Sequence, residues 1–193
     1  MCIRDRLSSA TQILEQDLKL TVNRDKTHIA HSDGGIKFLG VEIGTLYTRI
    51  QAKKLQGFKA KVKQLTRRNS GMNLLEIIDR LNPLLRGFAN YFKIANCSRE
   101  FKSLSGWIRR RLRAIQLKLW KKPAKLHRKL KQLNYKPPFK FIKMNSWRNS
   151  ASPLASFSMP NKWFEELGLY SMDKVKTGWL VPILAKERYK ESA

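Results

Sequence analysis

Cations interleaved with aromatic rings are the residues in this sequence that could do chemistry. Trp107 is followed closely by Arg109 and Arg110, and Trp120 is followed by Lys121 and Lys122. Lysine and arginine neutralise phosphate charges, and aromatic side chains stack on unpaired bases. The pattern favours binding to a nucleic acid. An aromatic residue on an apolar helix face packs in the core instead, and Trp107 fits that interpretation better.

No complete set of catalytic residues is recognisable in the sequence. His28 and His31 lie near Asp33, but a fourth metal ligand is missing, so we expect these residues at the surface. Two-metal polymerase chemistry needs carboxylates held within about 4 Å of shared ions. Asp25 and Asp33 form no paired-aspartate hairpin of that kind. We therefore expect no metal site in this chain.

The net charge is the strongest signal in the composition. The 193 residues hold 40 Lys+Arg against 14 Asp+Glu, which gives a net charge of +26. Residues 53–143 hold 26 of these cations and only three carboxylates. Such a domain attracts a polyanion. A nucleic acid fits better than a membrane surface, because the charge is spread through the chain rather than confined to a tail.

The sequence also argues against several other classes of protein. No apolar run approaches the about 20 residues that a membrane span needs. The segment Met1–Arg6 lacks the apolar core of a secretory signal. Cys2 and Cys97 are too few for a disulfide framework or a cysteine-based zinc site. We expect a cytoplasmic protein with no membrane partner.

The elements that must position the cations begin with a small N-terminal sheet. The hydrophobic pattern predicts a helix over 8–19 and strands over 21–29, 36–43 and 46–50. Gly40 falls inside the second predicted strand, where a glycine often marks close backbone approach. This sheet is too small to fold comfortably alone, and it looks like the end of a larger α/β domain.

From residue 52 the spacing becomes helical. Helices are predicted over 52–68, 73–92, 98–120 and 123–133. Asn82-Pro83 either opens a new helix or kinks a continuing one. Residues beyond 133 are rich in loops and aromatic side chains. The predicted fold class is therefore α+β, with a small antiparallel sheet followed by a mainly helical domain.

The helix over 98–120 should present two different faces. Leu104, Ile108 and Leu112 share its apolar stripe, whereas Arg109, Arg110 and Arg113 fall on the opposite side at about 100° per residue. We expect these three arginines to face RNA. Arg111 lies at the edge of the stripe and is expected to anchor the helix internally.

Two stretches in this helical region resemble a known family. Leu81-Asn82-Pro83 followed by Arg86–Phe92, and then Trp107–Arg113, resemble the maturase segment of group II intron-encoded proteins. Upstream, Lys26-Thr27 and Ile36–Gly40 look like the last palm motifs of a reverse transcriptase. Downstream, Asn145–Arg148 and Met159–Phe164 resemble the C-terminal extension of some bacterial members. The motifs occur in the family's order and span most of the chain.

The resemblance implies a division of the chain and roles for particular residues. Residues 1–51 would be the end of a palm, 52–133 a helical thumb and maturase core, and 134–193 the extension. Lys26 would support catalysis, and Phe38, Leu39 and Gly40 would belong to the hairpin that grips the primer. The RNA-binding residues would be Lys54, Lys61, Arg67, Arg68, Arg86, Arg109, Arg110, Arg113, Lys121, Lys122, Lys125, Arg128 and Lys129.

The same resemblance implies a function and partners. A maturase binds its group II intron RNA and stabilises the fold in which the RNA splices itself. The intact parent enzyme would use Mg²⁺, copy the intron into DNA and have a DNA target as a further partner. Its paired-aspartate turn would lie before residue 1, so we expect this chain alone to lack polymerase activity and to carry no cofactor.

A second interpretation stays open at this point. A stand-alone structural RNA-binding protein, such as a ribosome-associated factor, would have an equally suitable composition. The Phe38-Leu39-Gly40 and Asn90-Tyr91-Phe92 motifs argue for the maturase instead.

Overall fold

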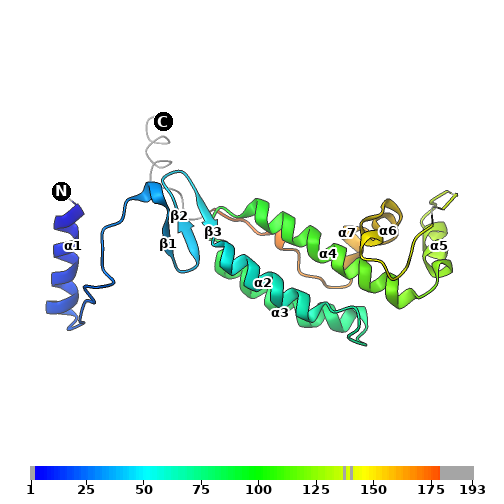
Figure 1. Ribbon diagram of the computed structural model, residues 1–193, viewed down its shortest axis with the longest axis horizontal. Helices are drawn as coiled ribbons and strands as arrows, with labels where there is room; N and C mark the ends of the chain where they lie inside the picture. The colour runs from blue at the N-terminus through cyan, green and yellow to red at the C-terminus, as the bar shows by residue number, and fades with distance from the viewer. Residues whose placement is uncertain (1–2, 137, 140, 179–193) are drawn as a thin grey trace.

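The structure is a computed structural model that describes residues 3–136, 138–139 and 141–178. It is an elongated α+β arrangement with a three-stranded sheet near one end and mainly helices elsewhere (Figure 1), and this confirms the predicted fold class. The helices are α1 (Ile3–Gln12), α2 (Ala52–Leu65), α3 (Leu74–Phe92), α4 (Ser98–Trp120), α5 (Pro123–Gln132), α6 (Pro153–Ser158) and α7 (Asn161–Glu166). The strands are β1 (Ile36–Phe38), β2 (Val41–Ile43) and β3 (Thr48–Ile50).

The N-terminal arm differs from its prediction. Helix α1 begins at Ile3 rather than at residue 8, passes into a π-helical turn over Ile13–Asp17, and buries none of its side chains. It stands apart from the other elements in Figure 1. The strand predicted over 21–29 is wrong, because the Thr27 hydroxyl and the Lys26 N–H bond back to Asn23 in a local turn.

The sheet is an antiparallel meander in the order β1-β2-β3. Phe38 pairs with Val41, so Leu39 and Gly40 form a two-residue turn between two strands, and the single strand predicted over 36–43 is wrong. Both turn residues have positive φ, +46° at Leu39 and +84° at Gly40, which a tight hairpin of this hand requires. A Cβ at Gly40 would also meet the stem of Lys54 at 3.2 Å.

Helices α2, α3 and α4 supply most of the core. Phe58, Leu81 and Leu85 are buried, and so is Leu112 of the predicted apolar stripe. Trp107, which the sequence analysis placed in the core, is only partly buried against it. Helix α3 starts at a capping box made by Asn73 and Glu76. It continues through Pro83, so of the two alternatives the continuing helix is correct.

The chain after α5 folds back onto the helical body. It forms a 3₁₀ turn over Arg148–Ala151, then α6 and α7, and a final segment that passes beside α4 toward the sheet (Figure 1). Residues 167–178 are called the return segment below. At its end the Gly178 N–H donates to the carbonyls of Lys93 and Ala95, at 3.1 and 3.0 Å. One apolar cluster runs from Val41 to Met172, and the predicted division into three parts stays a prediction.

We predict that the α3 core position Leu81 determines stability. Leu81 is fully buried, and Leu81→Ala should lower the free energy of unfolding by about 2–5 kcal/mol through lost burial and a cavity. Leu75→Ala is the matched control on the same helix, because that side chain is 51% exposed and its loss should cost little. Urea unfolding followed by circular dichroism measures both. Equal costs for the two variants would contradict this packing of α3.

Candidate nucleic-acid interface

Two segments carry exposed cations with no carboxylate among them. Residues 52–68, which include α2, hold seven Lys+Arg, and residues 121–132, which include α5, hold six. Neither stretch contains an aspartate or a glutamate. The side chains of Lys54, Lys61, Arg67, Lys121, Lys122, Lys125 and Arg128 are exposed, and Lys129 is half-buried. The predicted RNA-binding residues on these two segments are therefore accessible to a polyanion, except that Arg68 is half-buried against Trp147.

Arg109 does not lie on an exposed face, so that expectation is wrong. Its side chain is 9% exposed and pairs with Asp173 of the return segment, with Nη2 and Oδ2 3.2 Å apart. Nη1 lies 3.5 Å from the other carboxylate oxygen. The helix has an apolar stripe as predicted, but the return segment covers the opposite side as well. Arg109 therefore holds that segment in place.

Arg113 is also turned inward, which again differs from the prediction. Its Nε donates to the Met159 carbonyl at 3.0 Å, and its Nη2 donates to the Asn161 side chain at 3.1 Å. The guanidinium stacks on Phe164 at 5.5 Å. Burial lowers the pKa of Arg113, and the nearby positive charge of Arg109 lowers it further. Of the three arginines predicted to share an exposed face, Arg110 alone is exposed.

Helix α3 holds the return segment through Asn82, for which the sequence suggested only a helix start and a family motif. The Asn82 amide donates to the Gly168 carbonyl and accepts from the Tyr170 N–H, each at 2.9 Å. Arg86 is exposed, and its guanidinium lies 5.7 Å from the centre of the Tyr170 ring. Asparagine is unfavourable inside a helix unless its side chain makes hydrogen bonds elsewhere. The position of Asn82 within a helical pattern could therefore have indicated a tertiary contact.

Arg111 anchors α4 to the end of α2, which confirms the expected internal role. Its Nε donates to the Thr66 hydroxyl at 2.6 Å, and its Nη2 donates to the Thr66 carbonyl at 3.1 Å. The guanidinium also contacts two indole rings, Trp107 at 5.3 Å and Trp147 at 4.6 Å. Arg68 approaches the Trp147 ring too, at 5.1 Å. Burial lowers the pKa of both arginines.

Two motifs of the resemblance meet at the hairpin. The Tyr91 hydroxyl donates to the Leu39 carbonyl at 2.8 Å, across 52 positions of sequence. Phe38 and Leu39 remain 60% and 65% exposed, while Gly40 is buried beneath Lys54. The primer-grip role of this turn stays a prediction, but its position beside α3 is fixed by these contacts.

The residues weighed for catalysis and metal binding are not gathered into a site. Lys26 is exposed in the arm between α1 and the sheet. His31 and Asp33 form an exposed pair 3.1 Å apart. Within residues 3–136, 138–139 and 141–178, no three His, Cys, Asp or Glu side chains come close enough to hold a metal ion. The supporting role of Lys26 stays a prediction.

Comparison with known proteins adds to this geometry. Residues 55–134 match the family model described as the group II intron, maturase-specific domain. The match supports a maturase domain over this stretch of the helical body. The match begins in the first turn of α2 and ends just after α5, so it contains the cationic segment 121–132 and all but the first three residues of the segment 52–68. It implies a function related to the splicing of group II introns. A search of curated proteins found no significant match.

Membrane association through a spanning helix has no support in the described chain. No helix that the structure describes is both long enough and apolar enough to cross a bilayer.

We predict that removing Arg109 destabilises the maturase domain. Arg109→Ala leaves Asp173 without its partner and should lower the free energy of unfolding by about 2–3 kcal/mol. This is less than the loss from a fully buried pair, because the Asp173 side chain is 24% exposed to solvent. Arg110→Ala removes the same charge from the exposed neighbour and should cost almost nothing. Thermal unfolding of both variants, followed by circular dichroism, measures the difference in stability. Equal unfolding temperatures would contradict the structural role of Arg109.

Cys97 should be chemically inert in the folded protein. Its thiol is buried, donates to the Phe92 carbonyl at 3.2 Å, and burial raises its pKa to about 12. The reactive thiolate fraction at pH 8 is then on the order of 10⁻⁴. In a Cys2→Ser background, iodoacetamide should label Cys97 only after denaturant is added. Rapid labelling of the native protein would show that this part of the core is open.

Proposed function

We propose that this chain binds group II intron RNA and stabilises the fold in which the intron splices itself. The observation that carries the proposal is the pair of carboxylate-free cationic segments, residues 52–68 and 121–132, within or bordering the matched domain. The intron supplies the splicing chemistry, so the protein needs a binding surface rather than a catalytic pocket.

The charge distribution suits a structured RNA. Phosphates fix the position of a bound protein without carrying sequence information, so a cationic surface recognises the path of the backbone. Arginine can fork onto two phosphate oxygens, whereas lysine acts as a point charge. A dispersed set of both residue types follows a folded RNA better than a single deep pocket would.

The contacts we propose follow exposure rather than sequence position alone. Helix α2 and the turn that follows it contribute Lys54, Lys61 and Arg67, and helix α4 contributes Arg110. Residues at and before α5 contribute Lys121, Lys122, Lys125, Arg128 and Lys129. Arg109 and Arg113 are left out of this surface, because the return segment and α7 occupy them.

Further properties of a parent enzyme belong to the same proposal. We propose that the parent reverse-transcribes the intron, acts in intron mobility on a DNA target, and works in the cytoplasm. Such a polymerase uses Mg²⁺. The described residues do not fit that ion, since they bring no cluster of ligands together, and no step of the binding function depends on it.

Binding to intron RNA should be steeply dependent on salt. With roughly 6–8 phosphate contacts, log K against log salt should fall with a slope of about −4 to −7. Lys122→Ala/Lys125→Ala/Arg128→Ala should flatten that slope by about 2 units, since it removes three cations of the α5 region. Filter binding of a transcribed group II intron across a salt series measures both.

The matched control removes three cations from the N-terminal arm. Arg4→Ala/Arg6→Ala/Arg24→Ala has the same charge as the α5 variant, and these three exposed residues precede the sheet and the matched segment 55–134 in the chain. It should keep the wild-type slope. Failure of the wild-type chain to bind intron RNA, or identical slopes for both triple variants, would refute the proposed surface.

A further inference from the structure

A basic hollow lies where the end of α2 meets α4 and the segment 145–147. Its volume is about 770 Å³. Five of the side chains around it are cationic and the others are amides or an indole. The lining residues are Lys63, Arg67, Arg68, Asn69, Arg111, Lys118, Asn145 and Trp147. None of these lining residues carries a carboxylate, so the hollow has a strong positive potential.

Arg68 gives this hollow an unmet requirement for an acceptor. Its Nε is buried and has no hydrogen-bond partner. The neighbouring Arg111 and Lys118 cannot accept from it, because both are donors themselves, to the Thr66 hydroxyl and to the Asn69 side chain. A buried donor without an acceptor costs free energy, and the surrounding cations add repulsion. An anion with several oxygen acceptors, such as a phosphate, would relieve both costs.

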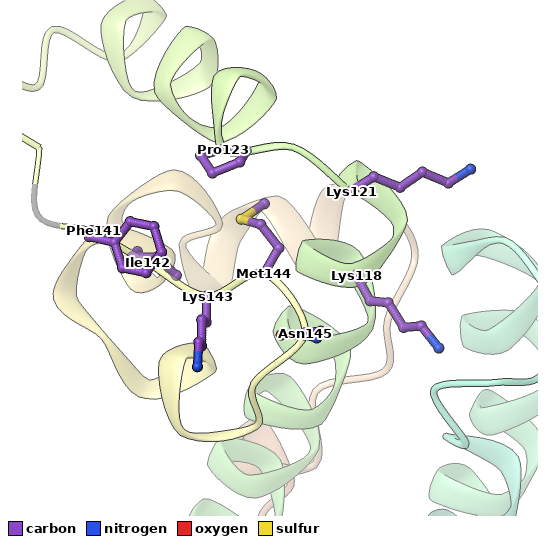
Figure 2. A pocket seen from close by; sticks show the side chains of 8 residues that line it. All are labelled: Lys118, Lys121, Pro123, Phe141, Ile142, Lys143, Met144 and Asn145. Carbon is purple, nitrogen blue, oxygen red and sulfur yellow. The ribbon is translucent and has the colours of Figure 1, made fainter.

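A second, apolar hollow adjoins the first. Its volume is about 510 Å³, and it shares Lys118 and Asn145 with the basic hollow. Pro123, Phe141, Ile142 and Met144 line it together with Lys121 and Lys143. Figure 2 shows Phe141 and Ile142 on one side and Lys118 and Lys121 extending from the end of α4 on the other.

Phe141 is unusual among the apolar side chains of the described chain. It is 83% exposed, although its neighbours Ile142 and Met144 are buried. An exposed aromatic ring among lysines is the arrangement by which proteins stack single-stranded bases. At this exposure the ring contributes little to the hydrophobic core.

We propose that the two hollows together hold one unpaired nucleotide of the bound RNA. Its phosphate occupies the basic hollow beside Arg67 and Arg68, and its base lies in the apolar hollow against Phe141. The inference rests on the RNA-binding function proposed above and adds a specific site to it. A paired base is stacked inside its helix and cannot enter, so the site selects single-stranded positions such as loops and bulges.

Two variants separate the roles of the two hollows. The probes are a fluorescein-labelled single-stranded RNA of about 10 nucleotides, within the usual range of such sites, and the same strand with abasic residues. Phe141→Ala should weaken binding of the intact strand about 5- to 150-fold and leave the abasic strand unchanged. Arg67→Ala/Arg68→Ala should weaken both strands and flatten the salt slope by about 1–2 units.

The controls address charge, folding and free phosphate. Arg4→Ala/Arg6→Ala removes two cations from the N-terminal arm and should bind both strands as the wild type does. Because Phe141 is so exposed, its variant should keep the wild-type circular dichroism and unfolding temperature, so that a change in affinity is not a folding defect. Inorganic phosphate at constant ionic strength should not displace the labelled strand, since it lacks the base.

Each result bears on one of the two proposals. If Phe141→Ala binds both strands like the wild type, or if inorganic phosphate displaces the strand completely, the nucleotide site is refuted. Salt-dependent binding of intron RNA by the wild-type chain would then leave the general function standing. If the wild-type chain binds no RNA at all, the proposed function fails and the nucleotide site fails with it.

Discussion

The hydrogen bonds between Arg111 and Thr66 connect α2 with α4, and the position of the cationic surface depends on this connection. They tie the end of α2 to the middle of α4, and the same guanidinium lies against Trp107 and Trp147. This half-buried cation is stabilised by a hydroxyl, a carbonyl and two indole faces. The position of Trp147 brings the segment 145–147 against the end of α2, and this closes the basic hollow around Arg68.

A shortage of carboxylates shapes the rest of the molecule. With 40 cations and 14 anions, most arginines that enter the interior must find other acceptors. Arg113 uses a backbone carbonyl and an asparagine, while Arg109 takes one of the few ion pairs in the described chain. The cations of α2 and α5 have no aspartate or glutamate within their own segments to pair with. They therefore give the domain the uncompensated positive surface that a polyanion recognises.

The arginines of α4 divide into those that hold other segments in place and one that is exposed. Arg109 and Arg113 hold the return segment and α7, Arg111 holds α2, and Arg110 faces solvent. The return segment is itself fixed at three separated points: by the side chains of Asn82 and Arg109, and by the backbone carbonyls of Lys93 and Ala95. The motifs that carry the family resemblance therefore serve largely to pack distant segments together, whereas the exposed cations of α2 and α5 remain available to a polyanion.

The sequence by itself determined the features that depend on neighbouring residues. Helical spacing predicted α2 to α5, the composition of residues 121–132 predicted an exposed cationic segment, and the position of Arg111 beside the apolar stripe predicted an anchor. Only the tertiary structure decided which cations are covered. Asp173 lies 64 positions from Arg109, and Asn161 lies 48 positions from Arg113. A helical wheel distinguishes the two sides of α4, but whether the polar side meets water depends on the path of a segment far along the chain.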